Sequence, residues 1–162
     1  MNESNELNEY FSFLIVDDDE KKIDLASRLL QTRGIDAHSI TGDNIEEKLN
    51  SAVYQIHKEG RFPVIFLDEN FGYKEPKSGT EMAISLTKSF KEIGGILLPF
   101  SSSSKEQCDN WWHEIRDQGS WVLADQGMLL TEYIYDGEID ALCTDFLNDF
   151  NNREDGSEVK NG

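Results

Sequence analysis

The feature that most constrains this fold is a regular alternation of short apolar runs with longer segments of helical periodicity. The strongly apolar runs predict strands covered on both faces, and they are FLIV (13–16), PVIFLD (63–68), ILLPF (96–100) and SWVLA (120–124). A more polar strand is expected at IDAHSI (35–40). Between the strands, apolar residues recur at helical spacing and predict helices at 20–33, 43–59, 82–93, 103–118 and 139–150. Strands and helices that alternate in this way predict an α/β fold with a five-stranded, doubly wound parallel sheet.

By composition, the chain divides into one folded domain and two polar ends. At 162 residues it has the length of a single domain. Residues 1–10 are polar and predict a flexible N-terminus, and residues 11–150 hold all the strand and helix patterns. Residues 151–162 (NNREDGSEVKNG) contain almost no apolar side chains, so they predict a disordered acidic tail.

The charge balance argues against several classes of partner. The chain has 15 Lys and Arg residues against 32 Asp and Glu residues, which gives a formal net charge of −17. This sign disfavours nucleic acid, whose phosphates require clustered cations, and anionic membranes. No apolar run is long enough to span a bilayer, no signal peptide is visible, and Cys108 and Cys143 lack the spacing of metal ligands. We therefore expect a soluble cytoplasmic protein.

Acidic side chains follow the first and the third predicted strands. Asp17, Asp18 and Asp19 end the run FSFLIVDDD, and Asp68 ends PVIFLD. Sites in doubly wound sheets form just outside the carboxyl ends of the strands, so these carboxylates are expected at one edge. Carboxylates brought together repel one another, and burial adds a desolvation cost. Two interpretations follow: a solvated turn tolerates the acids without any function, or a divalent cation offsets their repulsion.

This order of elements, with acids at the ends of strands, resembles the receiver domain of two-component response regulators. The resemblance spans roughly residues 11–150 and implies a flavodoxin-like, receiver-like fold. In that family an acidic pair ends the first strand, a phospho-accepting Asp ends the third, and a Ser or Thr ends the fourth. The matching residues are Asp17 and Asp18 for the pair, Asp68 for the acceptor, Ser101 for the hydroxyl and Gly79 for the glycine that opens the third helix.

The resemblance also implies a chemistry for these residues. Mg²⁺ would be held by Asp17, Asp18, Asp68 and the backbone carbonyl of Asn70. A carboxylate oxygen of Asp68 would attack phosphorus, and Ser101 would serve as the switch hydroxyl. The phosphoryl group would come from a histidine kinase or a phosphotransfer protein. The chain would then act as a stand-alone receiver that signals through altered affinity for a downstream protein.

One departure from the family pattern opens an alternative function. The fifth strand of receivers ends in Lys, whereas this chain has Asp125 in WVLADQG. An anion at this position repels the phosphoryl group that the Lys would stabilise. Lys74, Lys77 or Lys105 could supply the missing cation from neighbouring loops. The alternative is a degenerate pseudo-receiver, which keeps the fold and acts as a phosphorylation-independent protein-interaction module.

A third alternative, from another class, is a phosphatase that resembles the haloacid dehalogenase family. Asp17 and Asp19 follow an apolar strand with the spacing of the nucleophile motif of that family, and Ser101 could be its second element. Lys21 stands where the family has Thr or Val, and no basic residue ends a later strand. In this interpretation Asp17 would be the nucleophile in place of Asp68.

Two further segments indicate an interaction surface. The stretch DQGMLLTEYIYDG (125–137) is unusually long for the connection before the last helix, and it is rich in apolar residues. Trp111 and Trp112 are adjacent, so they cannot both face the core from one helix. We expect one of them to be exposed or covered by this stretch, and to contact a partner or a second copy in a homodimer.

Overall fold

The strands form one parallel sheet whose order, β2-β1-β3-β4-β5, is that of the doubly wound, flavodoxin-like fold. They are β1 (Phe11–Val16), β2 (Ala37–Ile40), β3 (Phe62–Leu67), β4 (Gly95–Pro99) and β5 (Trp121–Leu123). The computed structural model describes residues 3–69, 71, 78–90, 92–99, 113, 121–123 and 137–161. The prediction of an α/β fold with a five-stranded parallel sheet is confirmed.

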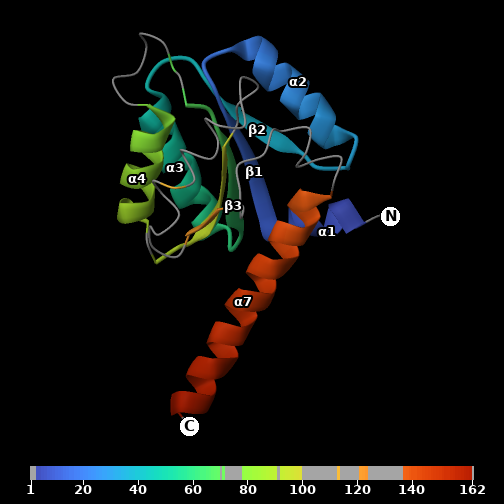
Figure 1. Cartoon of the computed structure of the whole chain (residues 1–162), viewed down its shortest axis with the longest axis vertical. Coiled ribbons are helices and arrows are strands. Elements are labelled where there is room, and N and C mark those ends of the chain that lie inside the picture. The colour runs from blue at the N-terminus through green and yellow to red at the C-terminus, as the bar shows by residue number, and fades with distance from the viewer. Residues whose placement is uncertain are drawn as a thin grey trace.

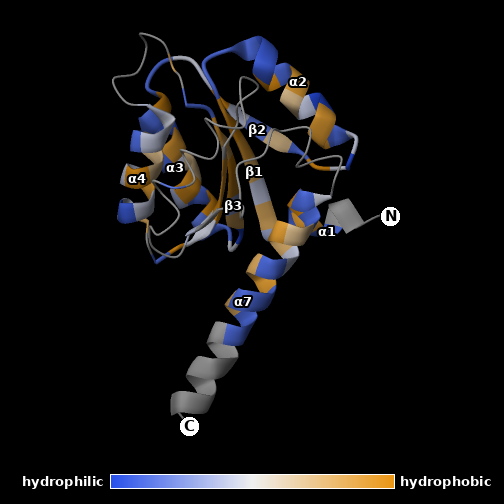
Figure 2. Cartoon of the chain, viewed as in Figure 1, coloured by the Kyte–Doolittle hydropathy of each residue, from blue (hydrophilic) through white to orange (hydrophobic). Residues whose placement is uncertain are grey.

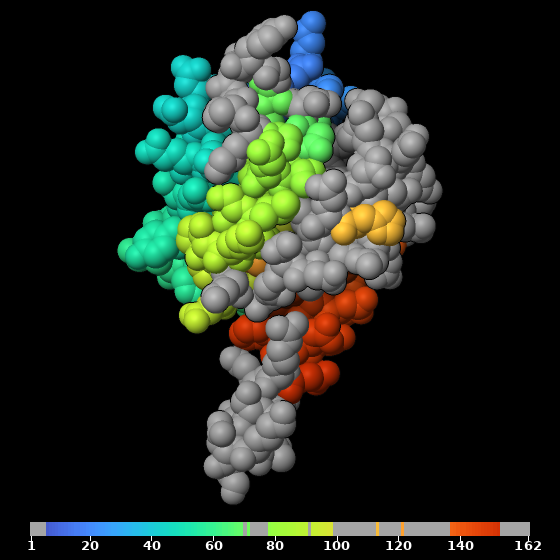
Figure 3. All heavy atoms as spheres, turned by 60° about the vertical axis from the view of Figure 1, so that its left-hand side comes forward, coloured from blue at the N-terminus to red at the C-terminus, as the bar shows by residue number. Residues whose placement is uncertain are grey.

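Helices cover both faces of the sheet (Figure 1). Those described are α1 (Glu3–Tyr10), α2 (Glu20–Gln31), α3 (Ile45–Lys58), α4 (Gly79–Ser89) and α7 (Glu138–Asn161). α3 and α4 cover one face and lie side by side on the surface of the molecule (Figure 3). Two apolar clusters result: one joins α1, α2 and α7 to the sheet, and the other joins α3 and α4 to the opposite face.

The central strands contribute to both clusters because successive side chains of a strand point to opposite faces. In β1, Phe13 and Ile15 belong to the cluster of α1, α2 and α7. Leu14 and Val16 belong to the cluster of α3 and α4. Every residue of β1 is therefore buried, which accounts for the continuous apolar run at 13–16. Figure 2 shows these apolar strands in the interior, with polar residues on the outer sides of the helices.

The last helix, α7, packs on the sheet through aromatic rings. The ring of Phe146 lies 5.9 Å from that of Phe11 and 4.9 Å from that of Phe62, in edge-to-face orientation. Arg33, which follows α2, forms an ion pair with Asp140 on α7. Phe11 and Phe62 are the first residues of β1 and β3, so the aromatic contacts hold the two strands at the end opposite to their acidic carboxyl ends.

The N-terminus differs from the flexible segment that the sequence predicts at 1–10, because Glu3–Tyr10 form the helix α1. Leu7 of this helix is buried in the core. Asn8 donates a hydrogen bond from Nδ2 to the carbonyl oxygen of Gly34 at 2.8 Å. The same side chain accepts the Asp36 N–H on Oδ1 at 3.4 Å. A buried leucine and the two hydrogen bonds of Asn8 therefore help to hold a segment whose own composition is too polar to indicate burial.

Two other segments also differ from the expectation. The sequence predicts a disordered tail at 151–162, whereas α7 continues to Asn161 and extends past the edge of the sheet (Figure 1). A helix that begins in the core can continue because each added residue adds one hydrogen bond. α3 begins only at Ile45, since Asn44 before it is left-handed, with φ of 58°. The helix predicted at 103–118 lies outside the described residues, and none of the described helices is long and apolar enough to span a membrane.

Candidate metal centre

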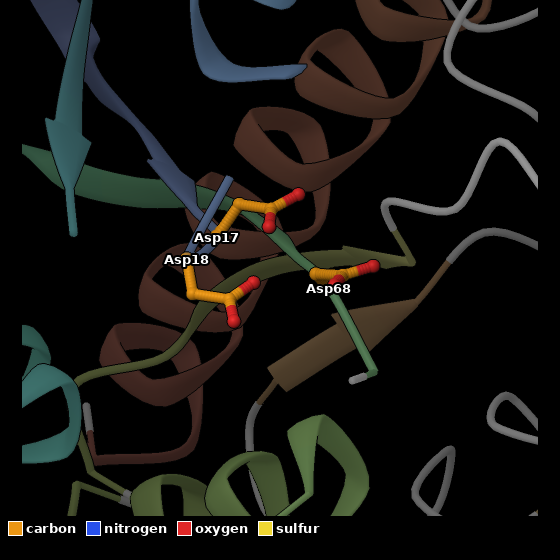
Figure 4. A group of neighbouring side chains, drawn as sticks. All are labelled: Asp17, Asp18 and Asp68. Carbon is orange, nitrogen blue, oxygen red and sulfur yellow. The ribbon is translucent and has the colours of Figure 1, made fainter. Parts of the chain in front are cut away.

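Three aspartates meet at the carboxyl ends of β1 and β3 (Figure 4). β1 and β3 are neighbours in register, with Val16 opposite Leu67. Asp17 and Asp68 follow these two residues, so they leave the sheet from adjacent positions. The Asp68 N–H donates to the Val16 carbonyl oxygen at 3.0 Å, and the Asp17 N–H donates to the Ile40 carbonyl oxygen at 3.3 Å. The parallel ladder thus continues one residue beyond the strands and holds Asp17 and Asp68 side by side.

The carboxylates of Asp17, Asp18 and Asp68 form one compact cluster. Each offers an oxygen, and these oxygens all lie within 4.8 Å of one another. Asp17 is fully buried, Asp68 is 5% exposed, and Asp18 is half-buried. The structure therefore brings together the three acids that the sequence singled out. Such a cluster raises the free energy of the folded chain unless a proton or a cation offsets its charge.

The carboxylate of Asp17 is fully buried. Its Oδ1 accepts a hydrogen bond from the Asp19 N–H at 2.9 Å. Its buried Oδ2 has no hydrogen-bond partner among the described residues. Burial raises the pKa of Asp17 from 3.8 to about 7; the Asp19 N–H opposes this rise, and the negative charge of Asp68 adds to it. A buried oxygen without a partner costs free energy, and a bound cation would remove that cost.

These residues have the donor set of a Mg²⁺ centre. Mg²⁺ prefers oxygen ligands, keeps several waters and is bound by few carboxylates. The half-buried Asp18 gives the cluster a side open to water, and the unpartnered Oδ2 of Asp17 is available as a ligand. A dication beside Asp17 would favour the ionised carboxylate and lower its pKa toward the ordinary range. The residues present therefore fit Mg²⁺.

Asp19 has a different role from its two neighbours. Its Oδ1 accepts the Lys21 N–H at 3.0 Å, which makes Asp19 the N-cap of α2. An acidic side chain at this position also interacts favourably with the helix dipole. Asp19 is thus absent from the carboxylate cluster within 4.8 Å. This arrangement disfavours the phosphatase interpretation, which pairs Asp19 with Asp17.

Gly79 brings the start of α4 against the backbone of Asp68. A Cβ atom on Gly79 would lie 1.9 Å from the Asp68 carbonyl oxygen and 2.9 Å from the Cα of Glu69. No side chain fits in that space, so this close approach requires glycine. The resemblance implied a glycine at the opening of this helix, and Gly79 is the first residue of α4.

The structure leaves several predicted residues undescribed. The positions outside the described residues are Asn70, Ser101, Asp125, Lys74, Lys77, Lys105, Trp111 and Trp112. Their roles stay predictions. Sequence reasoning missed Glu69, whose side chain bonds to Thr80 at the start of α4. The only local signal was an acid placed before a helix N-terminus, and the two residues are 11 positions apart.

The sheet order and the cluster of aspartates at one edge of the sheet define the chain as a doubly wound α/β domain with a candidate divalent-cation site. Solved receiver domains share this fold. A two-component response regulator from Cytophaga hutchinsonii is 20% identical, with a TM-score of 0.56 over 86% of this chain and 98% of that chain. A CheY-like receiver domain protein from Methanospirillum hungatei is 13% identical, with a TM-score of 0.53 and the same coverage of 86% and 98%.

A LuxR-family response regulator from Aurantimonas sp. is also similar, at 15% identity and a TM-score of 0.54 over 82% of this chain and 84% of that chain. The chain therefore has the fold of response regulator receiver domains, as its sequence pattern implied. No protein-family model and no curated protein matches the sequence.

Proposed function

We propose that this chain is a receiver protein of a two-component phosphorelay, which accepts a phosphoryl group on Asp68 in the presence of Mg²⁺. The observation that supports this proposal most is the cluster of Asp17, Asp18 and Asp68, with a buried carboxylate oxygen that lacks a hydrogen-bond partner among the described residues. Packing does not account for such a cluster, because buried carboxylates destabilise a core. Perturbed acids at a sheet edge are typical of functional sites.

In this proposal Asp68 is the nucleophile. One of its carboxylate oxygens attacks phosphorus of a phosphohistidine or an acyl phosphate, the P–N or P–O bond of the donor breaks, and the leaving group departs with the electron pair. Asp17, Asp18, the other carboxylate oxygen of Asp68 and the backbone carbonyl of Asn70 would hold Mg²⁺, which would supply charge neutralisation for the phosphoryl oxygens. The hydroxyl of Ser101 donates a hydrogen bond to the phosphoryl group.

The proposed partners are proteins. A histidine kinase or a phosphotransfer protein donates the phosphoryl group, and a downstream protein target binds with an affinity that depends on phosphorylation. The formal net charge of −17 disfavours direct action on nucleic acid or on anionic lipid.

The second candidate function is a pseudo-receiver that binds its partner without phosphorylation. Asp125 is the observation that favours it, since receivers have a cation at the end of the fifth strand and this chain has an anion there. Without that cation, the phosphoryl oxygens lose a stabilising charge and meet a repulsive one. The two candidates share the fold and differ in whether Asp68 reacts.

Incubation with Mg²⁺ and acetyl phosphate, followed by intact-mass measurement, separates these functions. We expect the wild type to gain one phosphoryl group, and we expect Asp68→Asn or a chelator to prevent the gain. Asp19→Asn is the matched control, because Asn caps a helix as well as Asp does and Asp19 is outside the cluster. A wild type that gains no mass with Mg²⁺ would favour the pseudo-receiver. Labelling lost in Asp17→Asn and retained in Asp68→Asn would favour the phosphatase.

A further inference from the structure

Glu69, the residue after Asp68, is bonded to the first turn of α4 by three hydrogen bonds. Its side chain accepts from both donors of Thr80, the backbone N–H at 2.7 Å and the Oγ1 hydroxyl at 2.8 Å. Its carbonyl oxygen accepts the Gly79 N–H at 2.9 Å. Thr80 is 7% exposed and Glu69 is half-buried, so these bonds are partly shielded from water. Hydrogen bonds to an ionised carboxylate are stronger than neutral ones, and a bidentate pair also fixes orientation.

α4 does not need the Thr80 hydroxyl for its own capping. Ser78 is the N-cap of α4 and forms a capping box with Glu81: the Ser78 Oγ accepts the Glu81 N–H, and the Ser78 N–H donates to the Glu81 carboxylate. This box accounts for the N–H groups of Ser78 and Glu81, and Glu69 accepts the N–H groups of Gly79 and Thr80. The bond from the Thr80 hydroxyl to Glu69 therefore does something other than capping, and joins α4 to the residue beside Asp68.

The backbone of Asp68 is consequently held on two sides. On one side its N–H donates to the Val16 carbonyl oxygen at 3.0 Å, which ties it to β1. On the other side its carbonyl oxygen lies against Gly79, where a Cβ atom would come within 1.9 Å. Glu69 and Thr80 hold α4 in that position. The described residues on either side of positions 70–77 are thereby held close together, as the 2.9 Å bond between Glu69 and Gly79 shows.

We infer that the Glu69–Thr80 pair, which we call the clamp, consists of positioning residues that hold Asp68 in the geometry required for Mg²⁺ binding and phosphoryl transfer. This inference rests on the proposed function, because it concerns how Asp68 is presented to its ligands. The clamp touches neither ligand: it acts through the backbone of Asp68 and the first turn of α4. Groups that orient metal ligands without contacting the metal typically change metal affinity by 10- to 100-fold.

The test is a Mg²⁺ titration of full-length Thr80→Val by calorimetry. This substitution removes the hydroxyl and leaves every charge in place. We expect the Mg²⁺ dissociation constant to rise about tenfold, and Thr80→Ser, which keeps the hydroxyl, to restore it. Thr87→Val is the matched control: Thr87 is another buried threonine of α4, and its hydroxyl bonds within the helix, to the Ile84 carbonyl oxygen at 3.1 Å. Thr87→Val should bind Mg²⁺ like the wild type.

A second readout needs no metal. If the clamp holds Asp68, amide hydrogen exchange of the Asp68 N–H in metal-free protein should be faster in Thr80→Val than in the wild type, and unchanged in Thr87→Val. A third comparison separates position from charge: Glu69→Gln removes the charge and can still bond to Thr80, whereas Glu69→Ala removes both. The clamp predicts a larger loss of Mg²⁺ affinity for Glu69→Ala than for Glu69→Gln.

The outcomes distinguish this inference from the proposed function. If the wild type binds Mg²⁺ and Thr80→Val is folded with unchanged affinity and unchanged exchange at Asp68, the clamp has no positioning role and the proposed function stands. Equal losses in Glu69→Gln and Glu69→Ala, with no loss in Thr80→Val, would assign the effect to charge and overturn the inference. A wild type that binds no Mg²⁺ would remove the proposed function, and the inference with it.

Discussion

Asp17→Asn should make the metal-free protein more stable at pH 8. Burial raises the pKa of Asp17 from 3.8 to about 7, and the charge of Asp68 adds to the rise. Between these values the carboxyl is protonated in the folded chain and ionised in the unfolded chain, so unfolding releases a proton. The stability from this group is therefore full below about pH 4, falls as the pH rises, and is lost once the pH passes about 7.

The magnitude follows from the difference between the two pKa values. From 3.8 to about 7, at about 1.4 kcal/mol for each pH unit, the ionised Asp17 lowers the free energy of unfolding by about 4 kcal/mol. Asn carries no charge and avoids this cost. Its side-chain amide would, however, place a polar atom where the unpartnered Oδ2 lies, and an unsatisfied buried amide costs about 1–3 kcal/mol. The net gain expected for Asp17→Asn at pH 8 is therefore about 1–3 kcal/mol, and it should disappear near pH 4.5.

The assay is urea denaturation followed by tryptophan fluorescence, at pH 4.5, 6 and 8 with a chelator present. Asp24→Asn is a control for charge, because Asp24 is exposed on α2 and should give no gain that depends on pH. Mg²⁺ at ten times its dissociation constant should then stabilise the wild type by about 1.4 kcal/mol and the Asp17→Asn variant by less. Equal free energies of unfolding for wild type and Asp17→Asn at pH 8 would refute the reasoning.

Two further substitutions test the backbone and the core around the site. Gly79→Ala should lower the free energy of unfolding by about 1–3 kcal/mol and weaken Mg²⁺ binding in calorimetry. The reason is that its Cβ would lie 1.9 Å from the Asp68 carbonyl oxygen. A variant as stable as the wild type would show that α4 can shift freely. Phe146→Ala should cost about 3–5 kcal/mol in urea denaturation, since Phe146 is 5% exposed and packs on Phe11 and Phe62. Its Mg²⁺ affinity should stay at the wild-type value, and a parallel loss of affinity would contradict the separation of core and site.

The strands and the acidic cluster could be predicted from the sequence because both depend on local patterns. A central strand of a parallel sheet is buried on both faces, so β1 and β3 each contain a continuous apolar run. Residues that follow neighbouring parallel strands reach the same edge, which places Asp17 beside Asp68 once the two strands pair. Asp18 then enters the cluster as the next residue along the chain.

The clamp and α1 could not be predicted because each depends on a distant contact. Glu69 and Thr80 are separated by 11 positions, and whether they meet depends on how closely the ends of the connecting loop approach. α1 is held by Leu7 and by the bond from Asn8 to Gly34, which lies 26 positions away. Neither segment has a periodicity or composition that indicates these contacts.

The acidic cluster and the core constrain one another. Repelling carboxylates could separate if the strands that end in them were free to part. β1 and β3 are held along their length by six register pairs and by an apolar cluster on each face. The carboxylates therefore stay together, and burial, with a smaller contribution from the charge of Asp68, raises the pKa of Asp17. A proton and a divalent cation are then competing ways to relieve the same strain, so Mg²⁺ should stabilise the wild type most at pH 8 and least near pH 4.5, where the proton already occupies Asp17.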